Sequence, residues 1–303
     1  MEKRRLGRTG LMVTPLGLGT SEIGYQLETG TDVSALLNEF LDDGLNLIDT
    51  AECYVDAEEK IGKAVGHRRN EFVLLTKTGH AYELDGEDWD PAVMEIGLER
   101  SLRNLQTDHV DVLQIHSCSL ATLEKGDVIE VLKKAKEQGK TKFLGFSGDG
   151  EAAKWAVESG IFDTLQTSLN IADQEALDLT LPTAAQKDMG VILKRPVANG
   201  AWLGVDAPRS NYQSVYWQRL KELDYPFLRK PDDPMWPVNP FETALRFSIF
   251  TPGVSTAIVG TKSSGRWREN AEIIAKGPLG PAPYLEIRAK WKAVAKPDWV
   301  GQT

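Results

Sequence analysis

The sequence is poor in cysteine, in long apolar runs and in positive charge, and each shortage excludes a class of protein. Only Cys53 and Cys118 are cysteines among 303 residues, too few for the disulfide framework of a small secreted domain. No window approaches the roughly 18 uninterrupted apolar residues of a membrane span, and no apolar signal core follows the charged start. The formal net charge of −9 argues against a nucleic-acid partner and against a basic membrane-binding surface. We therefore expect a cytoplasmic protein with neither partner.

The glycine pattern of a dinucleotide-binding Rossmann domain, G-x-G-x-x-G, is also missing. Gly17 and Gly19 have no third glycine at the required spacing, and Gly145, Gly148 and Gly150 are spaced wrongly. A Rossmann domain is therefore not indicated.

Metal-binding patterns are equally scarce. The four histidines, His67, His80, His109 and His116, show no ligand spacing, so the sequence predicts no zinc site. We interpret Cys53 and Cys118 as two small buried residues, with a redox switch as the alternative.

What the sequence does contain is an alternation of short apolar runs with amphipathic helices. The eight runs cover residues 16–19, 45–49, 72–76, 110–116, 143–147, 164–168, 191–194 and 255–259. Several are apolar without alternation, as expected of parallel strands covered on both faces. Between them lie helical stripes, such as the one that Asp32 can cap, with Val33, Leu36, Leu37 and Phe40 on one face.

About eight strand–helix units predict an α/β fold, and their number favours a closed (β/α)8 barrel over an open sheet. Such a barrel would use residues 1–303 as a single domain. Residues 5–13, which include Gly7 and Gly10, are predicted to form a β-hairpin before the first barrel strand.

The segment 197–240, after the seventh predicted strand, interrupts this rhythm and is predicted to be a long loop. It contains seven of the 24 aromatic residues: Trp202, Tyr212, Tyr216, Trp217, Tyr225, Phe227 and Trp236. A loop that long in a compact domain is usually functional. Its rings either form an ordered lid or pocket wall, or simply pack the segment onto the barrel.

Polar side chains follow three consecutive predicted strands, where a barrel places its active site. Asp49, with Tyr54 close behind, ends the second strand, Lys77 ends the third and His116 ends the fourth. Each has an ordinary explanation alone, as a cap, a packed ring, a solvated lysine or a core histidine. A carboxylate, a phenol, an ammonium and an imidazole on one rim are harder to explain as four accidents.

This set suits the reduction of a carbonyl group, whose oxygen must gain a proton. A tyrosine such as Tyr54 can donate that proton if its phenolate is stabilised. We expect the Lys77 cation to lower the pKa of Tyr54, and Asp49 to hold Lys77 charged and aimed. His116 would donate a hydrogen bond that orients the substrate oxygen.

The end of the last predicted strand is suited to binding phosphate. Small and hydroxyl residues at a helix start, following Gly260 and Thr261, offer backbone N–H groups to an anion. Lys262, Arg266 and Arg268 add positive charge at the usual phosphate site of a barrel. The alternative is a helix cap with solvated basic residues.

Three stretches resemble the aldo-keto reductase superfamily: residues 47–54, which read Leu-Ile-Asp-Thr-Ala-Glu-Cys-Tyr, then Thr76-Lys77, then Gln114-Ile115-His116. The resemblance extends from the N-terminal hairpin to about Ala275. It implies a (β/α)8 barrel that reduces carbonyl compounds with NADPH, and it assigns the catalytic tetrad to Asp49, Tyr54, Lys77 and His116.

The resemblance also implies a cofactor site. Arg266, assisted by Lys262, would meet the 2′-phosphate of NADP, while Glu269 and Asn270 would hold the adenine. Arginine at that place favours NADP over NAD, since guanidinium pairs well with phosphate. The full set of implied cofactor-binding residues is Gly19, Thr20, Asp49, Ser147, Gln166, Lys194, Arg195, Gly260, Thr261, Lys262, Arg266, Glu269 and Asn270.

The nicotinamide end departs from the family pattern in two places. Ser147 and Gln166 match the residues that bind the carboxamide, but Gly148 stands where the family commonly has Asn. Lys194-Arg195 stands where the family often has the ring that stacks on the nicotinamide. Either another aromatic residue supplies that face, or the two cations contact the ring and phosphates differently.

The sequence therefore predicts an NADPH-dependent reductase of a small aldehyde or ketone, with Tyr54 as general acid. One alternative is a lyase or aldolase in which Lys77 forms a Schiff base with a carbonyl substrate. The other is a cofactor-sensing subunit with little catalytic activity. Substrate specificity is expected to lie in residues 197–240, in residues 80–89 and in the C-terminal tail with Trp299.

Overall fold

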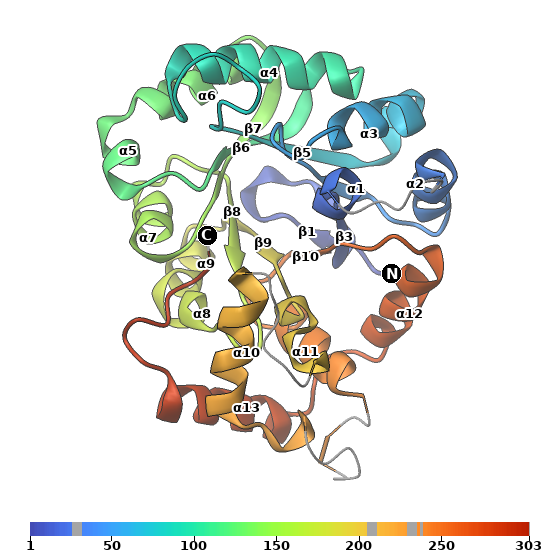
Figure 1. Cartoon of the computed structure of the whole chain (residues 1–303), viewed down its shortest axis with the longest axis vertical. Helices are drawn as coiled ribbons and strands as arrows, with labels where there is room; N and C mark the ends of the chain where they lie inside the picture. Colours follow the sequence, from blue (N-terminus) through green and yellow to red (C-terminus); the bar gives the residue numbers. More distant parts are fainter. Residues whose placement is uncertain (26–31, 205–210, 229–234, 237–238, 303) are drawn as a thin grey trace.

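The computed structural model describes residues 1–25, 32–204, 211–228, 235–236 and 239–302. Its centre is a closed barrel of eight parallel strands, in the order β10-β3-β4-β5-β6-β7-β8-β9 (Figure 1). The strands are β3 (Leu16–Gly19), β4 (Leu47–Asp49), β5 (Val73–Thr78), β6 (Val110–His116), β7 (Thr141–Ser147), β8 (Thr164–Ser168), β9 (Gly190–Lys194) and β10 (Thr256–Val259). The predicted (β/α)8 barrel is confirmed.

Helices form a ring around this barrel, as Figure 1 shows. They are α1 (Ser21–Tyr25), α2 (Val33–Asp42), α3 (Ala57–Val65), α4 (Pro91–Leu105), α5 (Leu120–Lys125), α6 (Asp127–Glu137), α7 (Gly150–Ser159), α8 (Glu175–Leu179), α9 (Leu181–Gln186), α10 (Asn211–Leu223), α11 (Pro240–Ile249), α12 (Ser264–Ala275) and α13 (Pro281–Val294). Asp32 caps α2 as predicted, because its carboxylate accepts a hydrogen bond from the backbone N–H of Ala35. The buried face of α2 includes Leu36, Leu37 and Phe40, so the apolar stripe faces the barrel.

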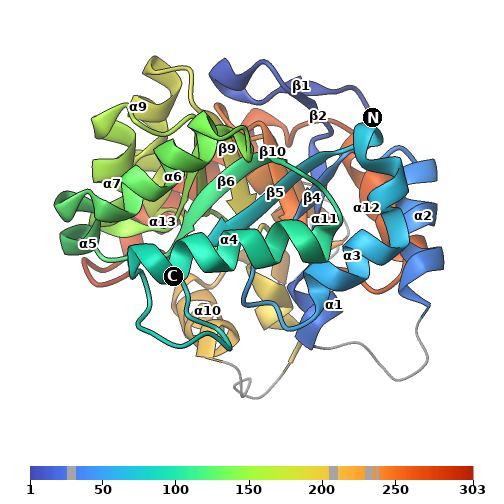
Figure 2. The same ribbon diagram turned by 90° about the horizontal axis from the view of Figure 1, so that it is seen from above.

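The N-terminal residues close one end of the barrel. Strands β1 (Arg4–Arg5) and β2 (Met12–Val13) form the predicted antiparallel hairpin. Leu6 and Val13 are fully buried against residues that point into the barrel, such as Leu47 and Ile192. Figure 2 shows this hairpin at the end opposite α10. The carboxyl ends of the strands, where the predicted site lies, therefore face away from the hairpin.

The segment 197–240 is not a loop throughout, so that prediction was partly wrong. It contains α10 and two 3-10 helices, Ala198–Leu203 and Pro226–Leu228, while residues 205–210, 229–234 and 237–238 lie outside the described residues. Tyr216, Leu220 and Leu223 are buried one turn apart on α10, which is the spacing of a helix that packs on a core. The many aromatic residues of this segment made the helical spacing of its buried side chains hard to recognise in the sequence.

The rings of this segment mostly pack, which favours the second of the two readings. Tyr216, Tyr225, Phe227 and Trp236 are buried in a cluster shared with residues of α11 and α13. Phe227 contacts Tyr225 at a ring-centroid distance of 5.2 Å and Trp236 at 4.7 Å. Only Trp202, Tyr212 and Trp217 among the seven remain partly exposed, so a contribution to a pocket wall falls to them.

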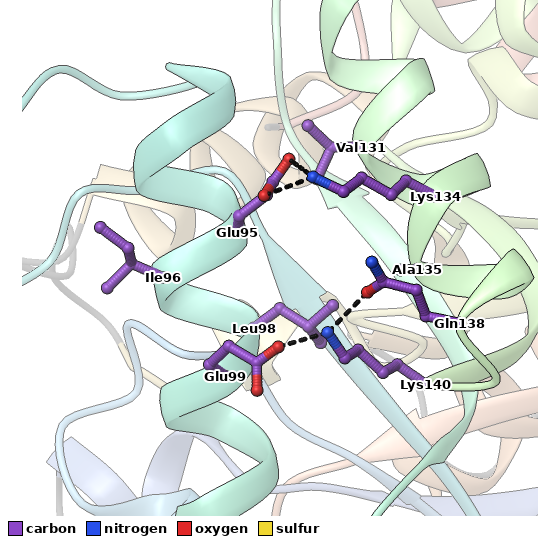
Figure 3. Close-up of a pocket in the computed structure, with 9 residues that line it drawn as sticks. All are labelled: Glu95, Ile96, Leu98, Glu99, Val131, Lys134, Ala135, Gln138 and Lys140. Carbon is purple, nitrogen blue, oxygen red and sulfur yellow. Dashed lines mark hydrogen bonds and ion pairs between the residues drawn. The ribbon is translucent and has the colours of Figure 1, made fainter.

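A surface groove between α4 and α6 lies on the outer wall of the barrel (Figure 3). Two ion pairs cross it, from Lys134 to Glu95 at 2.8 Å and from Lys140 to Glu99. None of its lining residues is a predicted site residue. The pairs instead fasten α4 to α6 and to the segment before β7.

Among the described residues, no helix has both the length and the apolar character needed to cross a lipid bilayer.

Candidate active site

Asp49 is the centre of a buried hydrogen-bond network at the carboxyl end of β4. Its Oδ2 lies 2.6 Å from Nζ of Lys77, and its Oδ1 accepts from Nε2 of Gln166 at 2.7 Å and of Gln114 at 3.1 Å. The carboxylate and the Lys77 side chain are each only 1 % exposed. A buried charge needs such partners, so three strands fix the position of one carboxylate.

Lys77 links this network to Tyr54. Its Nζ donates to the backbone carbonyl of Thr50 at 2.7 Å and lies 3.5 Å from Oη of Tyr54, the outer limit of a hydrogen bond. Burial is the largest single influence and works against the charged amine. The negative charge of Asp49, its hydrogen bond to the amine and the charge that Tyr54 and Cys53 can carry together outweigh burial, so the pKa of Lys77 is raised. Lys77 is therefore a permanent cation in this site.

Tyr54 is held by the loop between β4 and α3. Its backbone N–H donates to the carbonyl of Ala51 in a tight turn, and its ring meets that of Tyr25 edge-on at 6.1 Å. Gly24 allows α1 to approach so closely, since a Cβ at that position would lie 2.1 Å from the carbonyl oxygen of Tyr54.

Lys77 does act to lower the pKa of Tyr54, as expected, but the pKa of Tyr54 is nevertheless raised overall. Burial of the phenol is the larger influence, and it raises the pKa of Tyr54 above its ordinary value although Lys77 opposes it. The hydroxyl of Tyr54 is therefore protonated and can act as a donor.

His116 completes the group at the end of β6. Its ring lies 6.0 Å from that of Tyr54, and its backbone carbonyl accepts from Nε1 of Trp89 at 3.0 Å. Burial, followed by the positive charge of Lys77, lowers the pKa of His116 well below its ordinary value. The imidazole is therefore neutral, with one N–H to donate. The structure thus brings Asp49, Tyr54, Lys77 and His116 together, from three adjacent strands.

The residues expected at the nicotinamide end continue the same network. Ser147 Oγ donates to Oε1 of Gln166 at 3.2 Å, and Gln166 in turn donates to Asp49. Thr20 donates its hydroxyl and its N–H to the backbone carbonyl of Asp49, at 3.0 and 3.1 Å. Gly19, beside Thr20, pairs with Asp49 in the β3–β4 register.

Lys194 and Arg195 lie at the end of β9 but are engaged by protein groups. Lys194 forms an ion pair with the buried Asp149 at 2.8 Å. Arg195 donates to Oγ of Ser168 at 3.0 Å and to the backbone carbonyl of Gln302, and its guanidinium covers the ring of Tyr212 at 4.2 Å. Arg195, which stands where the family often has the stacking ring, therefore contacts Tyr212 and the C-terminal tail.

The predicted phosphate site lies at the start of α12. Ser263 caps this helix by accepting from the N–H of Arg266, and Thr261 hydrogen-bonds within the turn before it. Gly260 approaches Glu22, since a Cβ there would lie 3.0 Å from its carboxyl group. Lys262, Arg266 and Glu269 are exposed, whereas Asn270 is buried.

Arg268, the third cation predicted to add positive charge here, pairs with another part of the protein. Its Nε lies 2.7 Å from a carboxylate oxygen of Asp43, on the outer surface beside α2. In an α-helix, residues 266 and 268 point to different faces. Arg268 therefore faces the end of α2, where it pairs with Asp43. Among the described residues, Arg266 forms no ion pair.

Comparison with known proteins identifies the family to which this architecture belongs. The family model for the aldo/keto reductase family matches residues 15–292. The chain belongs to this family. Membership supports an oxidoreductase that acts on carbonyl groups.

Individual relatives align with this chain over most of their length. The chain is 31 % identical over 303 residues to the uncharacterized oxidoreductase YrpG of Bacillus subtilis, covering 90 % of this chain and 91 % of that protein. It is 26 % identical over 291 residues to L-galactose dehydrogenase of Arabidopsis thaliana, covering 91 % and 89 %. Among solved structures, the holo form of aldo-keto reductase AKR11C1 from Bacillus halodurans superposes with a TM-score of 0.80 at 26 % identity, covering 99 % of both chains.

Sequence reasoning missed several residues that shape the site of this aldo/keto reductase. Gln114 was noted only as part of a stretch that resembles the family and was given no role, yet its amide binds Asp49. Asp149, which accepts from the backbone N–H and hydroxyl of Ser168 and pairs with Lys194, carried no sequence signal at all. Cys53, His80 and His116 also converge on one point, although their spacing along the chain resembles no metal motif.

Proposed function

We propose that this aldo/keto reductase reduces an aldehyde or a ketone to an alcohol with NADPH, and that Tyr54 is the general acid. The observation that supports this most directly is the linked arrangement of Asp49, Lys77 and Tyr54, with His116 beside the phenol. It combines a permanent cation, a protonated hydroxyl and a neutral imidazole on one rim.

Each residue has a distinct part in this proposal. When bound, the nicotinamide would supply the hydride for the carbonyl carbon. Tyr54 would donate its proton to the carbonyl oxygen. Lys77, kept charged by Asp49, stabilises the phenolate that Tyr54 becomes. His116 donates a hydrogen bond that orients the carbonyl oxygen. Gln114 and Gln166 hold Asp49 so that Lys77 cannot turn away.

The donor groups at the start of α12 fit an adenosine 2′-phosphate. Arg266 projects into solvent without an ion pair among the described residues, and a guanidinium is well suited to phosphate. Nδ2 of Asn270 is buried and has no hydrogen-bond partner among those residues, which is unusual for a buried amide and leaves it available to an adenine nitrogen. Ser147 and Gln166 would hold the nicotinamide carboxamide.

The alternative of a Schiff-base enzyme is disfavoured by the environment of Lys77. A nucleophilic lysine must be a neutral amine, which requires a lowered pKa. Asp49 and the carbonyl of Thr50 instead hold Lys77 as a cation, with a raised pKa. The complete group of four residues likewise favours catalysis over a role confined to cofactor sensing.

We further propose that residues 1–303 act as a single domain in the cytoplasm. The support for one domain is that buried rings of α13 and the tail, Trp291 and Trp299, share a core with Ile171 and Phe247 of the barrel. The support for a cytoplasmic location is the composition alone.

Replacing Tyr54 with Phe tests the proposed function. The variant keeps the ring and loses the acidic proton, so kcat for aldehyde or ketone reduction should fall by about two to four orders of magnitude. NADPH binding, followed by cofactor fluorescence, should stay close to that of the parent protein. Tyr284→Phe, on α13 beside Phe247, is the matched control. Parent-like turnover by Tyr54→Phe would refute the assignment.

A further inference from the structure

Three potential metal ligands meet at the edge of the proposed active site. Cys53 lies in the loop after β4, His80 follows β5, and His116 ends β6. One ligand atom from each lies within 4.8 Å of the other two, and all three side chains are half-buried. The ring of His116 faces Tyr54, so this cluster borders the place where the carbonyl oxygen would be protonated.

The spacing of Cys53 and His116 matches that of two ligands on one zinc ion. Their Sγ and Nδ1 atoms are 3.6 Å apart. Zinc bonds of about 2.3 Å to sulfur and about 2.05 Å to nitrogen, at a tetrahedral angle, put the two ligand atoms about 3.6 Å apart. Sulfur and imidazole together favour zinc over magnesium or calcium, which prefer oxygen ligands.

His80 can complete the set with a small movement. Two nitrogens on one tetrahedral zinc ion lie about 3.3 Å apart, so the His80 ring must approach by up to about 1.5 Å. Its side chain is 28 % exposed in a loop, and its ring already meets that of His116 edge-on at a centroid distance of 4.8 Å.

A carboxylate already orients His80 as in many zinc sites. Nδ1 of His80 lies 3.0 Å from Oδ2 of Asp88, which leaves Nε2 as the nitrogen available to a metal. Pairing of one ring nitrogen with a carboxylate is the usual arrangement for a histidine that binds zinc through the other. Asp88 is itself held by the N–H of Ala81.

We propose that Cys53, His80 and His116 bind Zn²⁺, and that the bound ion blocks the carbonyl substrate. Three protein ligands leave the fourth position to water. As the zinc–sulfur bond forms, the thiol releases its proton to solvent, because cysteine binds the metal as a thiolate. The binding site stands on geometry alone. The block rests on the proposed function, since the ion and its water ligand would lie beside His116, where the proposed function places the carbonyl oxygen.

Metal binding is tested without reference to activity. Tag-free protein is titrated with Co²⁺, a spectroscopic substitute for zinc, and the near-ultraviolet absorption of a cobalt–thiolate bond is recorded. We expect a saturable band at one ion per chain that Zn²⁺ abolishes. Cys53→Ala should lose the band, and Cys118→Ala, which removes the other cysteine, should keep it. A band that survives in Cys53→Ala, or its absence from the parent protein, would overturn the site.

Inhibition is tested by steady-state kinetics. Zn²⁺ should raise the apparent KM for the carbonyl substrate without weakening NADPH binding, and a chelator should reverse the effect. In His80→Ala the zinc concentration for half-inhibition should rise at least about tenfold relative to that variant's own zinc-free rate. His109→Ala, which removes a half-buried histidine outside the cluster, should leave that concentration unchanged. A cobalt band without inhibition, or a faster reaction with zinc, would overturn the block while leaving the site intact.

Discussion

At the residue scale, the chemistry of this protein depends on which polar groups are paired and which are not. Asp49 and Lys77 form a buried ion pair inside the barrel, and two glutamine amides donate hydrogen bonds to the other oxygen of the carboxylate. Arg266, by contrast, extends into solvent at the start of α12. A buried pair keeps one fixed geometry, whereas an exposed cation can close on a ligand that arrives from solvent.

Arg266 therefore offers a prediction about cofactor choice. In Arg266→Ala, the affinity for NADPH should fall about ten- to hundredfold, as expected for a lost charge-assisted hydrogen bond. The affinity for NADH should stay nearly constant, because it has no 2′-phosphate. Fluorescence titration with each cofactor measures both values.

Arg268→Ala is the matched control for that experiment. Its guanidinium binds Asp43 rather than solvent, so both affinities should remain near those of the parent protein. An equal loss of NADPH and NADH affinity in Arg266→Ala would mean that the 2′-phosphate binds elsewhere.

At the element scale, the sequence predicted the strands better than the long connection after β9. Buried strands are short, continuous apolar runs, and the runs at 16–19, 110–116 and 164–168 match β3, β6 and β8 exactly in extent. The helix α10 was missed because its buried face is partly aromatic and its apolar positions are few. Its partner α13 lies far along the chain, so local sequence gave no sign of the core that the two helices share.

The crossing of α3 and α4 leads to a prediction about stability. At Gly62 a Cβ would lie 2.1 Å from the backbone carbonyl of Asn104, so Gly62→Ala must push the two helices apart. Overpacking of this kind costs about 1–3 kcal/mol of unfolding free energy. Chemical denaturation of the variant and the parent protein measures the loss.

Gly97→Ala in α4 is the control, and it should change the unfolding free energy in the opposite direction. Its added methyl would meet only ordinary contacts at 3.8 and 3.9 Å, and alanine favours a helix by up to about 1 kcal/mol over glycine. The variant should be as stable as the parent or more so. If Gly62→Ala matched it, the close approach of α3 to Asn104 would be wrong.

At the scale of the whole molecule, stability depends on acids that folding removes from water. Asp173 is fully buried, and Tyr216 donates to its Oδ2 at 3.2 Å, while its Oδ1 has no hydrogen-bond partner among the described residues. Burial raises the pKa of Asp173 from 3.8 to about 8, although Arg219, 3.7 Å away, opposes the shift. The folded chain therefore holds a proton that the unfolded chain releases.

This difference predicts that stability falls with rising pH. Between about pH 4 and pH 8 the folded state binds one more proton at Asp173, so unfolding becomes easier by up to about 1.4 kcal/mol per pH unit. Asp173→Asn, which cannot ionise, should lose this part of the slope when denaturation is followed from pH 4.5 to pH 8. Asp85→Asn, at an exposed loop position, should keep it. An unchanged slope in Asp173→Asn would show that the carboxyl is ionised in the folded state.

The sequence by itself determined the barrel and the residues that end its strands. The reason is local: apolar runs of strand length must be buried on both faces, and the carboxyl ends of parallel strands share one rim. Only the tertiary structure decided the partners on that rim. Cys53 meets His116, Lys194 pairs with Asp149 and Arg268 turns to Asp43 across separations that no local pattern records. It also decided the direction of the Tyr54 pKa, because desolvation depends on what packs around a group and not on its neighbours in the chain.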